Sequence, residues 1–169
     1  MKEKKNPRDA AADYIALRAR TEAELRRRLK EKEYTQEEIE ETLSFALDCG
    51  LVNDEEYSMR YTEYSMRKGR GPLRIFRELS EKGVSRGLIQ AALEAQFDAE
   101  TEYETALKLA VKELPEDADE KDFARTARKL ASRGFRSSAI SRVMNGLREG
   151  NLAGETKIRY DKKKFVFKE

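Results

Sequence analysis

The chain has no histidine, one cysteine, three prolines and nine glycines among its 169 residues. Without an imidazole, it can form neither a Ser-His or Cys-His catalytic pair nor a His-ligated metal site. The lone Cys49 can close no intramolecular disulfide, which fits a reducing compartment, so we expect a cytoplasmic protein. Because turn-forming residues are also too few for a many-stranded β fold, helices are favoured.

Long apolar runs are also missing. No stretch approaches 18 consecutive apolar residues, and the charged N-terminal segment is not followed by an apolar one. We therefore expect neither a membrane span nor a secretion signal. No Gly-rich phosphate loop is present, and paired carboxylates such as Asp117 and Asp119 stand in a short acidic connector, where we expect them to be solvated surface charges. We predict no catalytic residues, no cofactor and no metal.

The chain does contain an internal repeat with offsets of 50 and 51 residues. In each copy a leucine is followed five residues later by an apolar or aromatic residue, then by isoleucine after five more, and by leucine or methionine after a further four. These four ranks are Leu29/Leu79/Leu130, Tyr34/Val84/Phe135, Ile39/Ile89/Ile140 and Leu43/Leu93/Met144. The spacing is typical of two amphipathic helices joined by a short turn.

Glycine occupies the turn in two of the three copies, at Gly83 and Gly134, where a left-handed residue would end the first helix. Glu33 replaces it in the first copy, and a left-handed residue other than glycine costs roughly 1 kcal/mol. The first turn is therefore either differently shaped or mildly strained.

A further helical stretch precedes each pair of helices, so each copy should contain three helices. We predict an all-α fold: an elongated, curved array of three tandem three-helix units with a short C-terminal arm. The predicted units are residues 1–52, 53–97 and 98–150, and the basic arm is residues 151–169. A short hairpin, an extended arm and a disordered tail are all compatible with the composition of the arm.

The 35 basic and 33 acidic side chains are strongly segregated along the chain. Residues 60–77 carry six bases and one acid, residues 33–48 carry six acids and no base, and residues 121–148 carry eight bases and one acid. Arg27, Arg77 and Arg128 each lie two positions before the buried leucine, about 200° around the helix, so they should face solvent. We predict that they form one exposed basic row.

Other basic residues extend this pattern. Lys32, Lys82 and Arg133 share a second repeated position, Arg74 and Arg125 lengthen the row, and Arg67, Lys68 and Arg70 surround two glycines in a central loop. Such a loop can approach phosphates or a carboxylate-rich surface. The alternatives are solvated helix faces with i to i+4 ion pairs, or neutralisation by the protein's own acids at Glu37, Glu38, Glu40 and Glu41.

Two other features have plain structural interpretations. Tyr57, Tyr61 and Tyr64 could stack on nucleic-acid bases, but their spacing is that of a packed helix face, and we predict that they lie in the core. Cys49 is predicted to be a small buried residue.

Across roughly residues 10–150, the chain resembles the RecX family of regulatory proteins. The segments ELRRRLKEKEYTQEEIEETL, CGLVNDEEYSMRYTEYSMRKGRGPLRIFRELSEKGV and KLASRGF carry the resemblance. Its most specific positions are Asp54, Tyr57, Tyr61, Arg67, Gly69, Gly71, Leu79 and Gly83. The chain departs from the family pattern at Glu33 and in the basic segment after Asn151.

The resemblance implies tandem three-helix units and a non-catalytic modulator, mainly an inhibitor, of the RecA recombinase. Its partners would be the RecA filament and the single-stranded DNA within it, with bare DNA as an open alternative. We expect no membrane partner and a monomeric chain. The hypothesis for the contact surface is a centre at Arg67, Lys68, Arg70, Arg74 and Arg77, supported by Arg27, Arg125, Arg128 and Arg133. The competing interpretations are a stand-alone nucleic-acid-binding helical repeat protein and a purely structural scaffold.

Overall fold

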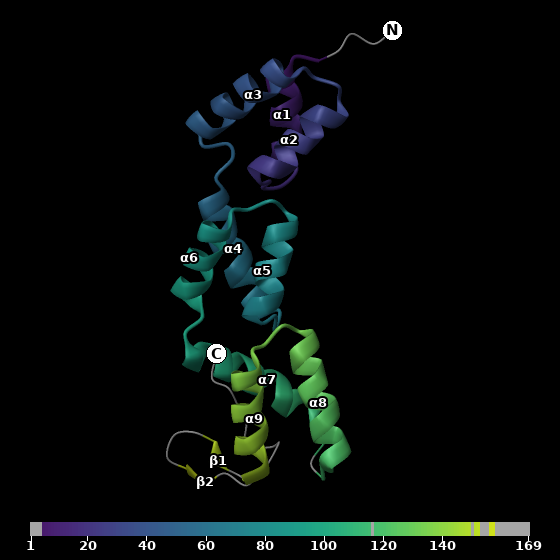
Figure 1. Ribbon diagram of the computed structural model, residues 1–169, viewed down its shortest axis with the longest axis vertical. Coiled ribbons are helices and arrows are strands. Elements are labelled where there is room, and N and C mark those ends of the chain that lie inside the picture. Colours follow the sequence, from purple (N-terminus) through teal and green to yellow (C-terminus); the bar gives the residue numbers. More distant parts are fainter. Residues whose placement is uncertain (1–4, 116, 150, 153–155, 158–169) are drawn as a thin grey trace. The chain divides into compact units, whose positions relative to one another are not determined.

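The computed structural model describes residues 5–115, 117–149, 151–152 and 156–157. These residues form nine helices and one antiparallel pair of two-residue strands (Figure 1). The helices are α1 (Pro7–Ala16), α2 (Glu22–Glu31), α3 (Gln36–Asp48), α4 (Asp54–Arg67), α5 (Pro72–Glu81), α6 (Arg86–Gln96), α7 (Ala99–Glu113), α8 (Glu120–Ser132) and α9 (Ser137–Glu149). The strands are β1 (Asn151–Leu152) and β2 (Thr156–Lys157). The predicted all-helical architecture is confirmed, while the remainder of the predicted arm lies outside the described residues.

Three turns of the same construction follow the leucine rank. The residue after each turn donates its backbone N–H to the leucine carbonyl, over 3.3 Å for Tyr34, 3.1 Å for Val84 and 3.2 Å for Phe135. The preceding residue is left-handed in all three copies, with φ of 81° at Gly83, 87° at Gly134 and 61° at Glu33. Of the two predicted alternatives for Glu33, the strained one is therefore correct, since the turn keeps its shape without glycine.

Each helix pair begins at a capping residue encoded locally. The hydroxyls of Thr21 and Thr35 accept the backbone N–H of Glu24 and Glu38, whose carboxylates in turn accept the threonine N–H, and these are two capping boxes. Pro72 occupies the first position of α5, where its missing N–H costs nothing.

The chain divides into two compact units. The first contains residues Met1–Thr62 and Phe76–Leu93, and the second contains Glu63–Ile75 and Glu94–Glu169. The division falls inside α4 and α5, so each unit combines segments that are distant in sequence. The boundaries of the three repeats, and their elongated and curved arrangement, stay predictions.

Each unit has its own apolar core. In the first unit, α1, α2 and α3 pack around Leu25, Leu29, Ile39 and Leu43, together with Tyr34 from the turn. In the second, α7, α8 and α9 lie side by side (Figure 1) and bury an apolar cluster. The residues of that cluster include Tyr103, Ala106, Ala110, Leu130, Phe135, Val143 and Met144. The first, second and fourth ranks of the repeat thus lie in the core in all three copies, as expected.

The α4 tyrosines do not lie in the core, and this prediction was wrong. Tyr57 and Tyr61 are half-buried and stack on each other with ring centroids 6.0 Å apart, while Tyr64 is 50% exposed. The buried face of α4 consists instead of Ser58, Thr62 and Ser65. Periodicity alone could not choose between these two faces, because both repeat every three to four residues.

The prediction for Cys49 was also wrong, because the residue is exposed. It caps the C-terminal end of α3, next to a left-handed Gly50. This position carries the side chain away from the core.

In each unit, the turn of one repeat packs against the start of a helix of the preceding repeat. We call this contact a junction. In the first unit, the Thr21 hydroxyl donates to the Lys82 carbonyl over 2.6 Å, and a Cβ on Gly83 would lie 2.2 Å from the Cβ of Ala23. The turn before α6 therefore lies directly on the start of α2. This contact explains why the compact unit includes residues 76–93.

The second junction is 50 residues further along the chain. The Gly71 N–H donates to the Arg133 carbonyl over 2.8 Å, and the Leu73 N–H donates to the Gly134 carbonyl over 3.0 Å. A Cβ on Gly71 would lie 2.4 Å from the Gly134 carbonyl, and one on Gly134 would lie 2.4 Å from Arg74 Cβ. The two glycines therefore permit an approach that no other residue pair would allow.

Candidate functional site

The central basic loop, residues 67–74, is fixed by backbone contacts. The Arg70 N–H donates to the Ser65 carbonyl over 3.0 Å, and Gly69 is left-handed with φ of 68°. The junction with Gly134 then holds the far end of the loop. Its basic side chains are exposed at Arg67 and Lys68 and half-buried at Arg70 and Arg74. Because the backbone that carries them is held in place, binding a partner would cost little backbone entropy.

The structure brings one predicted site residue from a distant segment to this loop. The Arg133 guanidinium donates to the Lys68 carbonyl over 3.2 Å, which places Arg133 beside the loop cations of the second unit. Arg67 and Lys68 are exposed. Their intramolecular partners are weak: Glu63 lies 3.6 Å from Arg67, and the Lys68 ammonium lies 5.6 Å from the Tyr64 ring centroid.

The predicted basic row has the expected exposure. Arg27, Arg77 and Arg128 are all exposed on their helices. Arg27 and Arg77 belong to the first unit and Arg128 to the second, so their alignment as one row stays a prediction. Arg125 is exposed and lies 2.8 Å from Asp122 in an i, i+3 ion pair.

The acids of α3 do not neutralise Arg27. Glu40 binds the neighbouring Arg26, which holds the pKa of that carboxyl below its usual value. The Glu38 carboxylate is engaged in the Thr35 capping box. Arg27 has no ion-pair partner among the described residues, so the alternative of intramolecular neutralisation does not apply to it.

A cavity of about 560 Å³ adjoins the central loop in the second unit. Its charged lining residues are Arg67, Lys68, Lys108, Lys112 and Glu104, with Met66 and Leu109 among the remainder. We call it the α4–α7 groove. The sequence interpretation missed Lys108 and Lys112, although they are the two bases of an otherwise acidic segment and stand four residues apart.

Three acids of α7 are held by cations of α8, of α9 and of the turn between them. Glu102, which is 2% exposed, accepts both the backbone N–H and the guanidinium of Arg136. Glu100 binds Arg142 over 2.8 Å, and Glu113 binds Lys129. These ion pairs explain why a segment that is acidic in sequence presents a mainly basic face to the α4–α7 groove.

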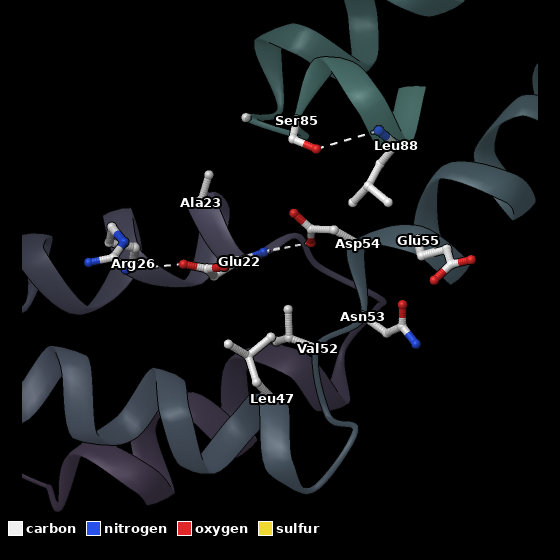
Figure 2. Close-up of a pocket in the computed structure, with 11 residues that line it drawn as sticks. Glu22, Ala23, Arg26, Leu47, Val52, Asn53, Asp54, Glu55, Ser85 and Leu88 are labelled. Carbon is white, nitrogen blue, oxygen red and sulfur yellow. Dashed lines mark hydrogen bonds and ion pairs between the residues drawn. The ribbon is translucent and has the colours of Figure 1, made fainter. Parts of the chain in front are cut away.

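The first unit contains a pocket of opposite character, of about 580 Å³ (Figure 2). Leu47 and Val52 line one side of it, and Glu22, Asp54 and Glu55 supply carboxylates. The Asp54 carboxylate accepts the Glu22 backbone N–H over 2.9 Å, and its burial raises the pKa of the group above its ordinary value. The pocket therefore contains a carboxylate whose charge is disfavoured by burial and by the neighbouring glutamates.

Two negative findings apply to the described residues. No group of three or more cysteine, aspartate or glutamate side chains among them could hold a metal ion. None of their helices is both long enough and apolar enough to cross a membrane.

Family models match two parts of the chain. The model of the first three-helix domain of RecX matches residues 8–45, and that of the second three-helix domain matches residues 53–93. These matches coincide with α1–α3 and α4–α6.

Curated relatives and solved structures extend the similarity over most of the chain. The regulatory protein RecX of Pseudomonas fluorescens is 35% identical over 141 residues, covering 82% of this chain and 90% of that protein. The regulatory protein RecX of Ectopseudomonas mendocina is 35% identical over 144 residues, covering 84% and 95%. The crystal structure of RecX from Lactobacillus salivarius matches the fold with a TM-score of 0.77, covering 84% of this chain and 94% of that one at 24% identity.

Proposed function

The chain belongs to the RecX family, and from this membership we propose that it is a non-catalytic regulator, mainly an inhibitor, of the RecA recombinase. It binds RecA filaments on single-stranded DNA and limits filament growth, ATP hydrolysis and strand exchange. Acting on RecA would place it in the cytoplasm, in homologous recombination, DNA repair and the SOS response. Binding by a monomer is part of the proposal.

The observation that supports this proposal best is the ordered central loop. Arg67 and Lys68 are exposed and Arg70 and Arg74 are half-buried on a backbone fixed at both ends, and Arg133 joins them across the junction. Arginine in particular offers paired N–H donors to carboxylates and phosphates. A filament presents both groups repeatedly, so a surface of this kind can bind through several weak contacts at once.

Exposed arginines outside the loop supply further cations. Arg27, Arg77, Arg125 and Arg128 are exposed on helices of the two units. Contacts made through a shared scaffold strengthen one another, because the second contact forms at the high effective concentration set by the first. We propose that these residues support the central contact.

The test is DNA-dependent ATP hydrolysis by RecA with this protein titrated in. Reversal of charge in R70E/R74E should weaken inhibition while far-UV circular dichroism stays unchanged. K30E/K121E is the matched control, since it makes the same charge change at two exposed lysines elsewhere. Full inhibition by R70E/R74E would exclude these two residues from the contact.

The stoichiometry of inhibition distinguishes two modes of action. Inhibition well below one protein per RecA protomer would indicate binding at filament ends, whereas saturation near stoichiometry would indicate binding along the groove of the filament.

The alternative function, a stand-alone nucleic-acid-binding protein, is favoured by the basic lining of the α4–α7 groove. Tight binding to bare DNA with a steep salt dependence, together with no effect on RecA ATP hydrolysis, would support it over RecA regulation. A purely structural scaffold would show neither response.

A further inference from the structure

The α4–α7 groove combines a charge pattern and a shape that the central loop alone does not have. Four cations line it: Arg67 at the end of α4, Lys68 directly after it, and Lys108 and Lys112 from α7; the single acid is Glu104. We infer that this groove binds the phosphate backbone of a single-stranded nucleic acid, with α7 supplying the phosphate contacts. The inference deepens the proposed function and rests on it, because it assigns the DNA-binding part of the site.

The spacing of the α7 lysines fits a strand with regularly placed charges. Lys108 and Lys112 are four residues apart, so they lie on one face of the helix with a rise of about 6 Å between them. This rise is comparable to the separation of successive phosphates along an extended strand. Both lysines are exposed, and their long stems allow each ammonium to adjust to a phosphate.

The surroundings concentrate positive potential in the groove. Three other acids of α7 bind cations outside the groove: Glu102 binds Arg136, Glu100 binds Arg142 and Glu113 binds Lys129. Glu63, the partner of Arg67, is a surface residue 3.6 Å away, and such pairs are easily exchanged for a phosphate. A cleft lined by one sign of charge attracts an oppositely charged polymer more strongly than a flat surface does.

An aromatic ring beside the groove favours a nucleic-acid strand over an acidic peptide. Tyr64 lies in the last turn of α4 and is 50% exposed, and the ammonium of Lys68, which directly follows α4, lies 5.6 Å from its ring centroid. An exposed ring next to cations is the combination that binds an unpaired base together with its phosphate. Glutamate and aspartate side chains would gain nothing from the ring.

The experiment measures binding of the full chain to a fluorescein-labelled oligothymidylate by anisotropy, without RecA, over a series of salt concentrations. K108A/K112A removes two phosphate contacts, which should lower the slope of log K against log salt by about 1.4. If affinities converge at 1 M salt, the variant should bind about 25-fold more weakly at 0.1 M salt. Y64A should weaken binding about tenfold with little change in slope, and Y64F should restore the affinity.

K30A/K121A is the control, because it removes the same charge from exposed positions of α2 and α8 outside the groove. Unchanged affinity and slope in K108A/K112A would overturn the inference, as would an equal loss in the control. Loss of RecA binding in the absence of DNA, with affinity for the oligonucleotide retained, would assign the groove to protein carboxylates and also overturn it.

Circular dichroism of each variant verifies the fold, and K108Q/K112Q repeats the test with a polar replacement. RecA ATP hydrolysis separates the two proposals. If the wild type does not inhibit RecA but K108A/K112A loses the oligonucleotide as expected, the proposed function fails and the groove assignment stands.

Discussion

Replacing Gly71 with alanine should separate the contribution of the junction from that of the helices it joins. Gly71 is buried, and an added Cβ would lie 2.4 Å from the carbonyl carbon and oxygen of Gly134 and from the Phe135 nitrogen. All three atoms belong to backbone, so no side chain can rotate away. The residue is not in the left-handed region, so alanine there adds a steric conflict without backbone strain.

The expected cost follows from what must move. Ordinary contact requires a separation of roughly 1 Å more, which would break the hydrogen bonds from Gly71 to Arg133 and from Leu73 to Gly134. Overpacking of this kind costs about 1–3 kcal/mol and each lost hydrogen bond about 1 kcal/mol. Alanine also reduces the conformational freedom of the unfolded chain, which offsets about 0.5–1 kcal/mol of this destabilisation. We expect a net destabilisation of about 2–4 kcal/mol.

Urea unfolding followed by far-UV circular dichroism measures this difference. Gly87→Ala is the control, since Gly87 has nothing within 4 Å of the added Cβ and lies in α6, where alanine should leave stability unchanged or raise it slightly. Gly71→Ala should also inhibit RecA less, because the loop arginines would be displaced. A loss of less than about 0.5 kcal/mol would refute the claim that the close approach holds the second unit together.

Three further substitutions test other parts of the structure. Thr21→Val should cost about 2–3 kcal/mol in urea unfolding, against about 1 kcal/mol for Thr35→Val. Both variants lose a capping hydroxyl, but only the buried Thr21 also donates to the Lys82 carbonyl, so equal costs would show that this bond contributes nothing. Glu33→Gly should stabilise the first unit by about 1 kcal/mol and raise the Tm, because it relieves a left-handed φ of 61°, and a lower Tm would mean that the side chain matters more than the strain. Asp54→Asn should gain stability relative to the wild type as pH rises from 3 to 7. Burial raises the folded-state pKa of Asp54, so the wild type loses the favourable neutral carboxyl through that range. A stability difference between variant and wild type that does not change with pH would contradict the assigned environment.

The repeated junction connects the fold to the candidate site. At the first junction a threonine hydroxyl satisfies the Lys82 carbonyl, and at the second a glycine N–H satisfies the Arg133 carbonyl. The glycine version brings the backbone of the arginine-rich loop into direct contact with the turn before α9. The structural constraint that requires Gly71 and Gly134 is therefore the same one that orders Arg67, Lys68, Arg70 and Arg74.

The basic residues at equivalent repeat positions show how far repetition predicts function. Lys82 and Arg133 share a rank, and both were noted as repeated bases. Lys82 is half-buried, binds Glu24 over 3.2 Å and covers the stacked rings of Tyr57 and Tyr61. Arg133 instead joins the central loop. Their shared position reflects the junction, and their roles diverge because the surfaces they meet differ.

The helices and the left-handed turns at Gly83 and Gly134 followed from the sequence, because each depends on residues close to one another along the chain, whereas the shape of the turn at Glu33 was left open. The exposure of Arg27, Arg77 and Arg128 was equally local, since it depends only on their angle from a buried leucine. The burial of the α4 serine and threonine face, the junction through Gly71 and Gly134, and the meeting of Lys108 and Lys112 with the end of α4 were decided by tertiary packing. These features join segments that are far apart in the sequence, and no local propensity specifies which distant surface a helix face will meet.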